Sequence, residues 1–179
     1  MGELSYTPDM RTKSSWTIGK LRRWIQSSLK NVDINSPAVV TDQLLAHVFG
    51  GNRVMLYADQ DRPATSGELD DLRPLVKRAL AGEPVQYIVG ESFFLGRPFY
   101  VNRGTLIPRS STETLVVIVS ELISEMDSIL EIGTGTGCIA ISLALKYQNS
   151  SIMAVDCSAE AIEVAKKNAC RHEVKKISF

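Results

Sequence analysis

Cysteine, histidine and unbalanced charge are scarce in this sequence, and each shortage narrows what the protein can do. Its three cysteines, Cys138, Cys157 and Cys170, form no C-x-x-C pair. Their number and spacing match no metal-site pattern, so we expect reduced thiols and no bound metal. Twenty basic side chains balance twenty acidic ones. No net field therefore attracts a nucleic acid or an anionic membrane, and we expect neither as a partner.

Long apolar runs are also missing. No stretch approaches the ~18 apolar residues that a membrane helix needs. The first fifteen residues, MGELSYTPDMRTKSS, lack the apolar segment of a secretion signal. We therefore expect a cytoplasmic protein. Hydrophobic residues make up 44% of the 179 positions, which suffices for one ordinary domain or two small ones.

Helical patterns fill the first eighty or so residues. After a polar tail that we expect to be frayed, three helices begin at N-cap signals: Thr17, Ser36 before a proline, and Thr65 with Glu68 in a capping box. Apolar residues recur every three or four positions after each signal, which predicts one buried face per helix. Pro74 lies within the third pattern and is expected to kink or restart that helix.

The composition changes between residues 84 and 104. This segment is rich in β-branched and aromatic residues and is divided by Gly90 and Gly96. Such a pattern predicts a β-hairpin. We take residues 84–104 as a linker between an N-terminal helical domain, residues 1–83, and a second domain, residues 105–179.

The second domain begins with another helical pattern. Ser110 and Glu113 have capping-box spacing. The apolar residues that follow predict a buried face made of Leu115, Ile118, Val119, Leu122 and Met126.

Strands and helices then alternate to the end of the sequence. Strands are predicted at 129–132, 152–155 and 177–179, and helices at 138–145 and 159–169. This order implies right-handed crossovers and a parallel sheet. The fold class is therefore α/β: a helical bundle, a hairpin linker and the first part of a Rossmann-like sheet.

A glycine cluster lies directly between the first of these strands and its helix. Ligands of parallel α/β sheets bind at this position, and glycines let the main chain turn sharply there while the helix start offers unpaired N–H groups. An acidic residue ends the next strand, about twenty residues on, where a carboxylate can accept hydrogen bonds from both hydroxyls of a ribose. The candidate cofactor-binding residues are Gly133, Thr134, Gly135, Thr136, Gly137 and Asp156. We call residues 133–137 the glycine bend.

Glycine spacing separates the candidate cofactors. A dinucleotide fingerprint is G-x-G-x-x-G, but here Cys138 follows Gly137, so the third glycine comes one position early. This disfavours a nicotinamide oxidoreductase. Alternating glycines preceded by Glu131 instead resemble the first motif of S-adenosylmethionine methyltransferases. A purely structural strand-to-helix turn is the alternative, and the carboxylate of Asp156 argues against it.

Three further segments narrow the resemblance to one family. The segment GEPVQYIVG at 82–90, with LIPR at 106–109, resembles the interdomain motif of the HemK/PrmC family, and LLAHVFG at 44–50 is similar to its N-terminal helical domain. That family methylates the glutamine of a Gly-Gly-Gln motif in peptide chain release factors. The resemblance implies S-adenosylmethionine as cofactor, a release factor as partner, cofactor contacts at the glycine bend and Asp156, and a substrate contact at Arg109.

The sequence departs from the family pattern at two places. Ser110 and Ser111 replace the proline and first glutamate of Arg-Pro-Glu-Thr-Glu, and the Asn-Pro-Pro-Tyr substrate loop does not occur. We therefore expect a shortened member with little or no turnover of its own. A sheet cut short exposes apolar strands, which predicts aggregation, dimerisation or partial disorder. The alternative function is a non-catalytic module that binds release factors.

Overall fold

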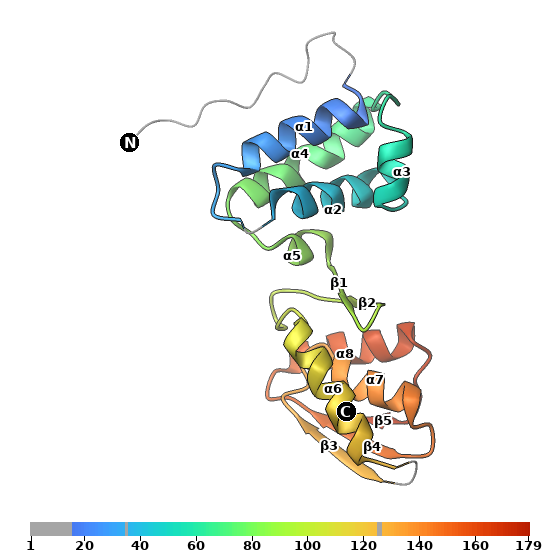
Figure 1. Cartoon of the computed structure of the whole chain (residues 1–179). Coiled ribbons are helices and arrows are strands. Elements are labelled where there is room, and N and C mark those ends of the chain that lie inside the picture. Colours follow the sequence, from blue (N-terminus) through green and yellow to red (C-terminus); the bar gives the residue numbers. More distant parts are fainter. Residues whose placement is uncertain (1–15, 35, 125–126) are drawn as a thin grey trace. The chain divides into compact units, whose positions relative to one another are not determined.

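The computed structural model of the chain describes residues 16–34, 36–124 and 127–179 (Figure 1). The expected frayed tail and Met126 lie outside these residues. The chain divides into two units, Met1–Val89 and Gly90–Phe179. Among the described helices, none combines the length and the apolar character needed to span a membrane.

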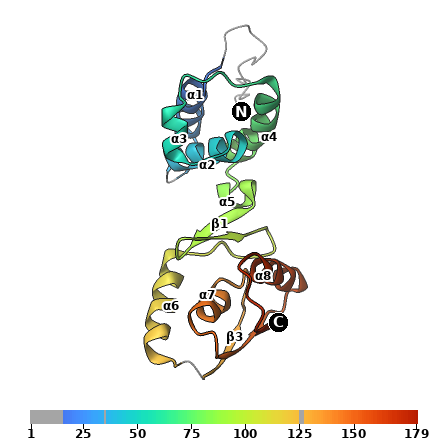
Figure 2. The same ribbon diagram turned by 90° about the vertical axis from the view of Figure 1, so that its right-hand side faces the viewer.

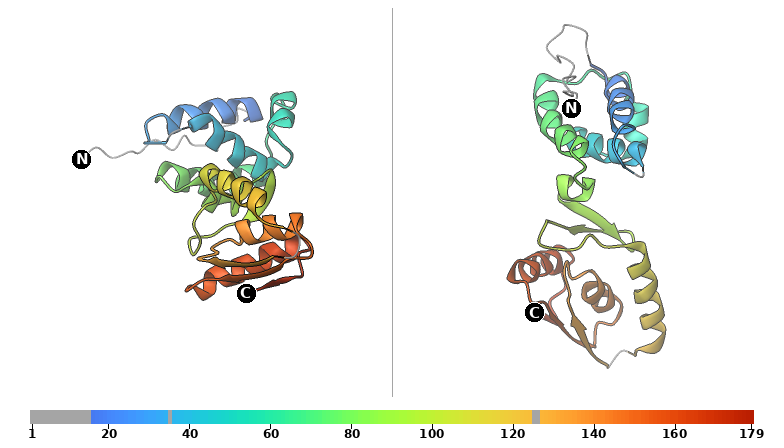
Figure 3. Two further views of the ribbon diagram at one scale, coloured as in Figure 1. Left: turned by 60° about the horizontal axis from the view of Figure 1, so that its bottom comes forward. Right: turned by 90° about the vertical axis from the view of Figure 1, so that its left-hand side faces the viewer.

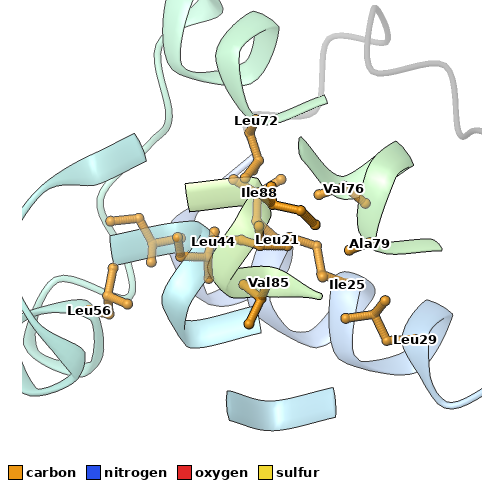
Figure 4. Packing of buried hydrophobic residues seen from close by; sticks show 12 residues of the cluster. Leu21, Ile25, Leu29, Leu44, Leu56, Leu72, Val76, Ala79, Val85 and Ile88 are labelled. Carbon is orange, nitrogen blue, oxygen red and sulfur yellow. The ribbon is translucent and has the colours of Figure 1, made fainter. Parts of the chain in front are cut away.

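Helices wound around a leucine-rich core make up the described part of the first unit. Leu21, Leu44 and Leu72 have no exposed surface, and Figure 4 shows side chains from several helices meeting there. Burying such a side chain contributes about 1.5 to 3 kcal/mol, which gives this unit a core of its own. The helices are α1 (Ile18–Leu29), α2 (Pro37–Phe49), α3 (Arg53–Ala58), α4 (Ser66–Leu80) and α5 (Val85–Val89).

The three predicted helix starts are confirmed. Thr17 caps α1, accepting a hydrogen bond from Lys20 N at 3.3 Å, and Ser36 is the N-cap of α2. Of the kink or restart expected at Pro74, the restart is wrong, because α4 runs without interruption from Ser66 to Leu80. Buried Leu72 and Val76 on either side of the proline hold both halves of the helix against the core.

The segment 84–104 forms a hairpin as predicted, but only after a short helix. Strands β1 (Glu91–Phe94) and β2 (Arg97–Tyr100) pair antiparallel. Residues 85–89, which we expected in the hairpin, are helix α5 instead. Val85 and Ile88 are three positions apart, and both are buried in the core of the first unit. Helical spacing puts both side chains on one face, which extended spacing would not do.

The second unit contains a parallel sheet, as the fold class requires. In the described residues the strand order is β3-β4-β5, with Ile129 opposite Ile152 and Ile152 opposite Ile177. Helix α7 lies between α6 and α8 (Figure 2 and the right-hand view of Figure 3). The elements are α6 (Ser110–Leu122), β3 (Ser128–Ile132), α7 (Cys138–Lys146), β4 (Ser151–Val155), α8 (Ala159–Arg171) and β5 (Ile177–Ser178).

One face of this sheet is covered and the other is open in the described residues. Ile152 and Ala154 of β4 are buried, whereas Leu130, Ile132 and Met153 on the opposite face are 59%, 79% and 53% exposed. Side chains alternate between the faces of a strand, so this pattern places the packed helices on one side only.

The predicted buried face of α6 is wrong at three positions, although Val119 packs partly buried against the core as expected. Val116 is the buried residue of α6, while Leu115, Ile118 and Leu122 are exposed. In the described residues α6 packs against α7. This contact covers only part of the apolar stripe of α6. Periodicity identifies the apolar side of a helix, but the number of neighbouring elements decides how much of that side is covered.

An ion pair reinforces the start of α4. Arg62 Nη2 lies 2.6 Å from Glu68 Oε1, and Glu68 Oε2 accepts the Thr65 N–H at 2.8 Å. The hydrogen bonds from the Arg62 guanidinium, joined by that N–H, lower the pKa of Glu68 to about 2. Folding thus favours the ionised carboxylate.

We expect Glu68→Gln to lower the free energy of unfolding by about 1 kcal/mol at pH 7. The lost stabilisation belongs to an ionised group with a depressed pKa, so in the wild type it is complete above pH 4.5 and disappears as the pH falls towards 2. Urea unfolding of the wild type and the variant at pH 7 and at pH 2 checks this. Asp70→Asn, in an exposed ion pair with Arg73 on the same helix, is the control. An equal Glu68→Gln effect at pH 7 and pH 2 would contradict the assignment.

Candidate functional site

The glycine bend follows β3 directly and adopts left-handed backbone angles at alternate positions. The φ angles of Gly133, Gly135 and Gly137 are 80°, 55° and 78°. A Cβ built on Gly133 or Gly135 would meet no atom within 4 Å, whereas one on Gly137 would lie 3.1 Å from Ala165 Cβ. The first two glycines therefore border open space, and the third lets α7 pack closely against α8.

The end of β4 holds the bend through the main chain. Val155 O accepts hydrogen bonds from Gly133 N at 2.8 Å and Thr134 N at 3.0 Å, and Gly137 N donates to Thr134 O at 2.8 Å. The sequence predicts unpaired N–H groups at the start of α7, but there Gly137 N and Ala140 N have partners within the protein. Main-chain donors of a bend are satisfied within the protein where an acceptor from a neighbouring strand lies within reach.

Asp156 lies against the bend, directly after β4. Its Oδ2 accepts the Gly135 N–H at 2.8 Å, and its Oδ1 accepts the Ser158 N–H at 2.9 Å. These bonds, first that from Ser158 and then that from Gly135, lower the pKa of Asp156. The carboxylate is therefore ionised at neutral pH, and Cys157 contributes further hydrogen bonds to it.

Glu131 fixes the other side of the bend from within β3. Its Oε2 accepts hydrogen bonds from Thr134 Oγ1 at 2.8 Å and from Ala140 N at 3.0 Å. Burial raises the pKa of Glu131. Thr134 and Thr136 are almost fully buried, at 3% and 2% exposure. Neither threonine therefore presents its hydroxyl group to the outside of the bend.

Helix α8 joins the hairpin to this region through residues that sequence reasoning did not single out. Glu160 Oε1 accepts a hydrogen bond from Asn102 Nδ2 at 2.8 Å, and Asn168 bonds both Tyr100 and Thr136. The burial of Asn168 distinguishes it in the structure, but burial cannot be read from a single sequence. In the sequence, Asn168 differs from its neighbours only in being a polar residue within the apolar stripe of α8.

The structure brings the six cofactor-site candidates together but does not join Arg109 to them. Arg109 is the N-cap of α6 and its side chain is exposed. None of the contacts in the described residues links it to the glycine bend. The predicted capping box at Ser110 is wrong as well, since the helix begins at Ser110 itself. Glu113 Oε1 instead accepts the Leu95 N–H of the hairpin turn at 2.6 Å.

The cysteines take no part in a metal centre of the described residues. Cys138 is buried, and burial raises the pKa of its thiol to about 11, so it stays protonated at neutral pH. Cys157 and Cys170 are exposed and free. In the part of the chain that the structure describes, no group of at least three His, Cys, Asp and Glu side chains gathers to hold a metal ion.

The parallel sheet, whose first strand ends in this glycine bend, defines a methyltransferase-type α/β unit. This unit follows the helical unit in the sequence. Comparison with protein families agrees on both units. Residues 20–90 match the PrmC N-terminal domain, and residues 123–179 match a methyltransferase domain. The chain belongs to the HemK/PrmC family.

Curated relatives carry the same pairing of units. Release factor glutamine methyltransferase of Chlorobaculum tepidum is 38% identical over 172 residues, which cover 92% of this chain and 58% of that protein. The proteins of the same name from Geobacter sulfurreducens and Aliivibrio fischeri are 37% and 39% identical and match 88% and 89% of this chain. The chain spans 55% to 58% of the length of these three relatives.

We expect Glu131→Ala to lower the free energy of unfolding by about 1 to 3 kcal/mol, because Thr134 Oγ1 and Ala140 N lose their acceptor. Glu131→Gln keeps an acceptor oxygen and should cost less. Burial raises the pKa of Glu131 in the folded wild type above its ordinary value of 4.5. Ionisation of Glu131 therefore opposes folding as the pH rises above 4.5. Urea unfolding between pH 4 and 8 should show the Gln variant gaining relative to wild type. A pH-independent difference would contradict this.

Proposed function

We propose that the glycine bend and Asp156 bind S-adenosylmethionine, and that the chain is the cofactor-binding part of a methyltransferase. The observation that carries this proposal is the 2.8 Å hydrogen bond from Gly135 N to Asp156 Oδ2. It fixes an ionised carboxylate beside the open side of the bend. Ligands of open α/β sheets occupy this end of the strands.

The residues at the bend fit the adenosine portion of this cofactor. The carboxylate of Asp156 is a charged acceptor for hydrogen bonds from the two ribose hydroxyls. Gly133 and Gly135 have no side chain, and the space where a Cβ would lie is open. When bound, the cofactor supplies an electrophilic methyl group on a sulfonium. The role of the chain's own residues is to bind and orient that group.

We propose that the methyl acceptor is the side-chain amide of the glutamine in the Gly-Gly-Gln motif of a peptide chain release factor. The motifs at 44–50, 82–90 and 106–109 and the names of the relatives support this. An amide nitrogen is a poor nucleophile because its lone pair is delocalised, so transfer depends on holding it close and correctly turned. The sequence contains no Asn-Pro-Pro-Tyr to do this. We therefore expect little or no turnover by this chain alone.

The remaining assignments belong to the same proposal. Residues 1–83 would dock the release factor, residues 84–104 would connect the two domains, and residues 105–179 would bind the cofactor. Arg109 is exposed and thus accessible to a protein substrate, and we assign it a substrate contact. The proposed reaction acts on a translation factor, so it requires no nucleic acid or membrane partner and takes place in the cytoplasm.

A non-catalytic release-factor-binding module is the second candidate. The first unit has its own buried core, which favours docking that does not depend on the cofactor. Release-factor affinity that is equal with and without S-adenosylhomocysteine would support this module. No affinity for release factor would remove it.

We expect Asp156→Ala to weaken binding of S-adenosylhomocysteine by about 1.5 to 3 kcal/mol, or about 10- to 150-fold in Kd. The loss arises because the ribose hydroxyls lose a charged acceptor. Isothermal titration of the folded variant measures it, with Glu163→Gln, an exposed carboxylate of α8, as the control. Unchanged affinity would exclude this role for Asp156. Tighter binding of NADH than of S-adenosylhomocysteine by the wild type would instead favour an oxidoreductase.

Transfer of labelled methyl groups to release factor tests the reaction itself. We expect background incorporation with this chain and clear incorporation with a version that is extended to the length of its relatives and contains an Asn-Pro-Pro-Tyr loop. Release factor whose motif glutamine is replaced by alanine is the control substrate. Failure of both proteins would count against the assignment. Full activity of the present chain would disprove the expected dependence on that loop.

A further inference from the structure

A single fully buried carboxamide joins three parts of the second unit. Asn168, in α8, has no exposed surface. Its Oδ1 accepts the Tyr100 N–H at 2.7 Å, and its Nδ2 donates to Tyr100 O at 3.0 Å and to Thr136 O at 2.9 Å. Tyr100 ends β2, and Thr136 lies in the glycine bend. The side chain therefore ties the hairpin to the bend.

The chemistry of these bonds requires an amide. A carboxamide has two N–H donors and one acceptor oxygen, and all three groups have partners here. Turning the group over would place its NH₂ against an N–H and its oxygen against two carbonyls, so the orientation is determined by its surroundings. An aspartate would hold negative charge against two carbonyl oxygens, and an apolar residue would leave buried main-chain groups unpaired.

The bond to Thr136 completes the fixation of the bend. Glu131 holds Thr134, and Asp156 holds Gly135. The peptide plane between Thr136 and Gly137 is then held on both sides, because Gly137 N donates to Thr134 O at 2.8 Å while Thr136 O accepts from Asn168. Anchors from β3, the end of β4 and α8 thus hold successive residues of the bend.

The last turns of α8 also hold the hairpin by other contacts. Arg171 Nη2 lies 2.6 Å from Glu91 Oε2, and Lys167 Nζ lies 3.9 Å from the centre of the Tyr100 ring. His172 Nε2 lies 2.9 Å from Pro98 O. Asn168, Lys167, Arg171 and His172 all contact the hairpin. Among the described residues' hydrogen bonds, only that of Asn168 also reaches the glycine bend. Loosening the hairpin and loosening the bend can therefore be separated by mutation.

We infer that Asn168 is a positioning residue of the proposed cofactor site, which sets the geometry of the glycine bend by coupling it to the hairpin. This rests on the proposed function for its effect on affinity, but the coupling itself is a property of the protein without ligand. A residue that only stabilises the fold would change the melting temperature and leave the folded bend as it is.

Hydrogen exchange and S-adenosylhomocysteine titration of the full chain test this inference. Asn168→Asp is nearly isosteric and removes both donors, so we expect at least tenfold faster exchange of the Gly133 and Gly137 amides and at least tenfold weaker binding. Both are measured at a temperature where circular dichroism shows the variant folded. Asn168→Ser, whose hydroxyl can donate one bond, should give a smaller change of the same kind and replaces the Asp variant if that does not fold.

Arg171→Gln is the matched control, since it loosens β1 without touching the bend. We expect faster exchange in the hairpin, with bend exchange and affinity within about twofold of wild type. Wild-type exchange at the bend in folded Asn168→Asp would overturn the inference, as would an Arg171→Gln effect on the bend equal to that of the Asp variant. If the wild type does not bind S-adenosylhomocysteine, the proposed function fails while the exchange data still decide the role of Asn168.

Discussion

The second unit depends on hydrogen bonds from β3 and from the end of β4 that hold the glycine bend in one conformation. Three glycines in five residues give the turn the left-handed angles that it needs, but glycine also has the largest conformational freedom in the unfolded chain. The turn therefore requires external contacts to hold one geometry. Val155 O and Asp156 provide them from β4, and Glu131 provides them from β3. The parallel register of these two strands places all three groups at the same edge of the sheet.

Two carboxylates hold the same turn and yet have opposite pKa shifts. Desolvation raises the pKa of Glu131, whereas N–H donors lower the pKa of Asp156. The difference follows from their places in the fold, since Glu131 bonds Thr134 and Ala140 from within β3 and Asp156 accepts main-chain N–H groups directly after β4. Asp156 is thereby suited to meet a ligand as an anion, and Glu131 is suited to a structural role.

The sheet of this unit is covered on one face only in the described residues. Leu130, Ile132 and Met153 are exposed on the other face, and the apolar stripe of α6 is largely exposed as well. A parallel sheet is normally covered on both sides, because its strands have no polar face. The relatives are longer than this chain, which spans 55% to 58% of their length.

Much of this architecture follows from the sequence by itself. The N-caps at Thr17, Ser36 and Thr65, the order of strands and helices after residue 128, and the position of the glycine bend are all local patterns, and each depends on residues within a few positions of one another. Tertiary structure alone decided the helix at 85–89, the exposure of α6, the pairing of the bend's N–H groups and the role of Asn168. These features depend on which distant residue supplies a partner or a cover. Asn168 bonds residues 68 and 32 positions away, and no local pattern records such a contact.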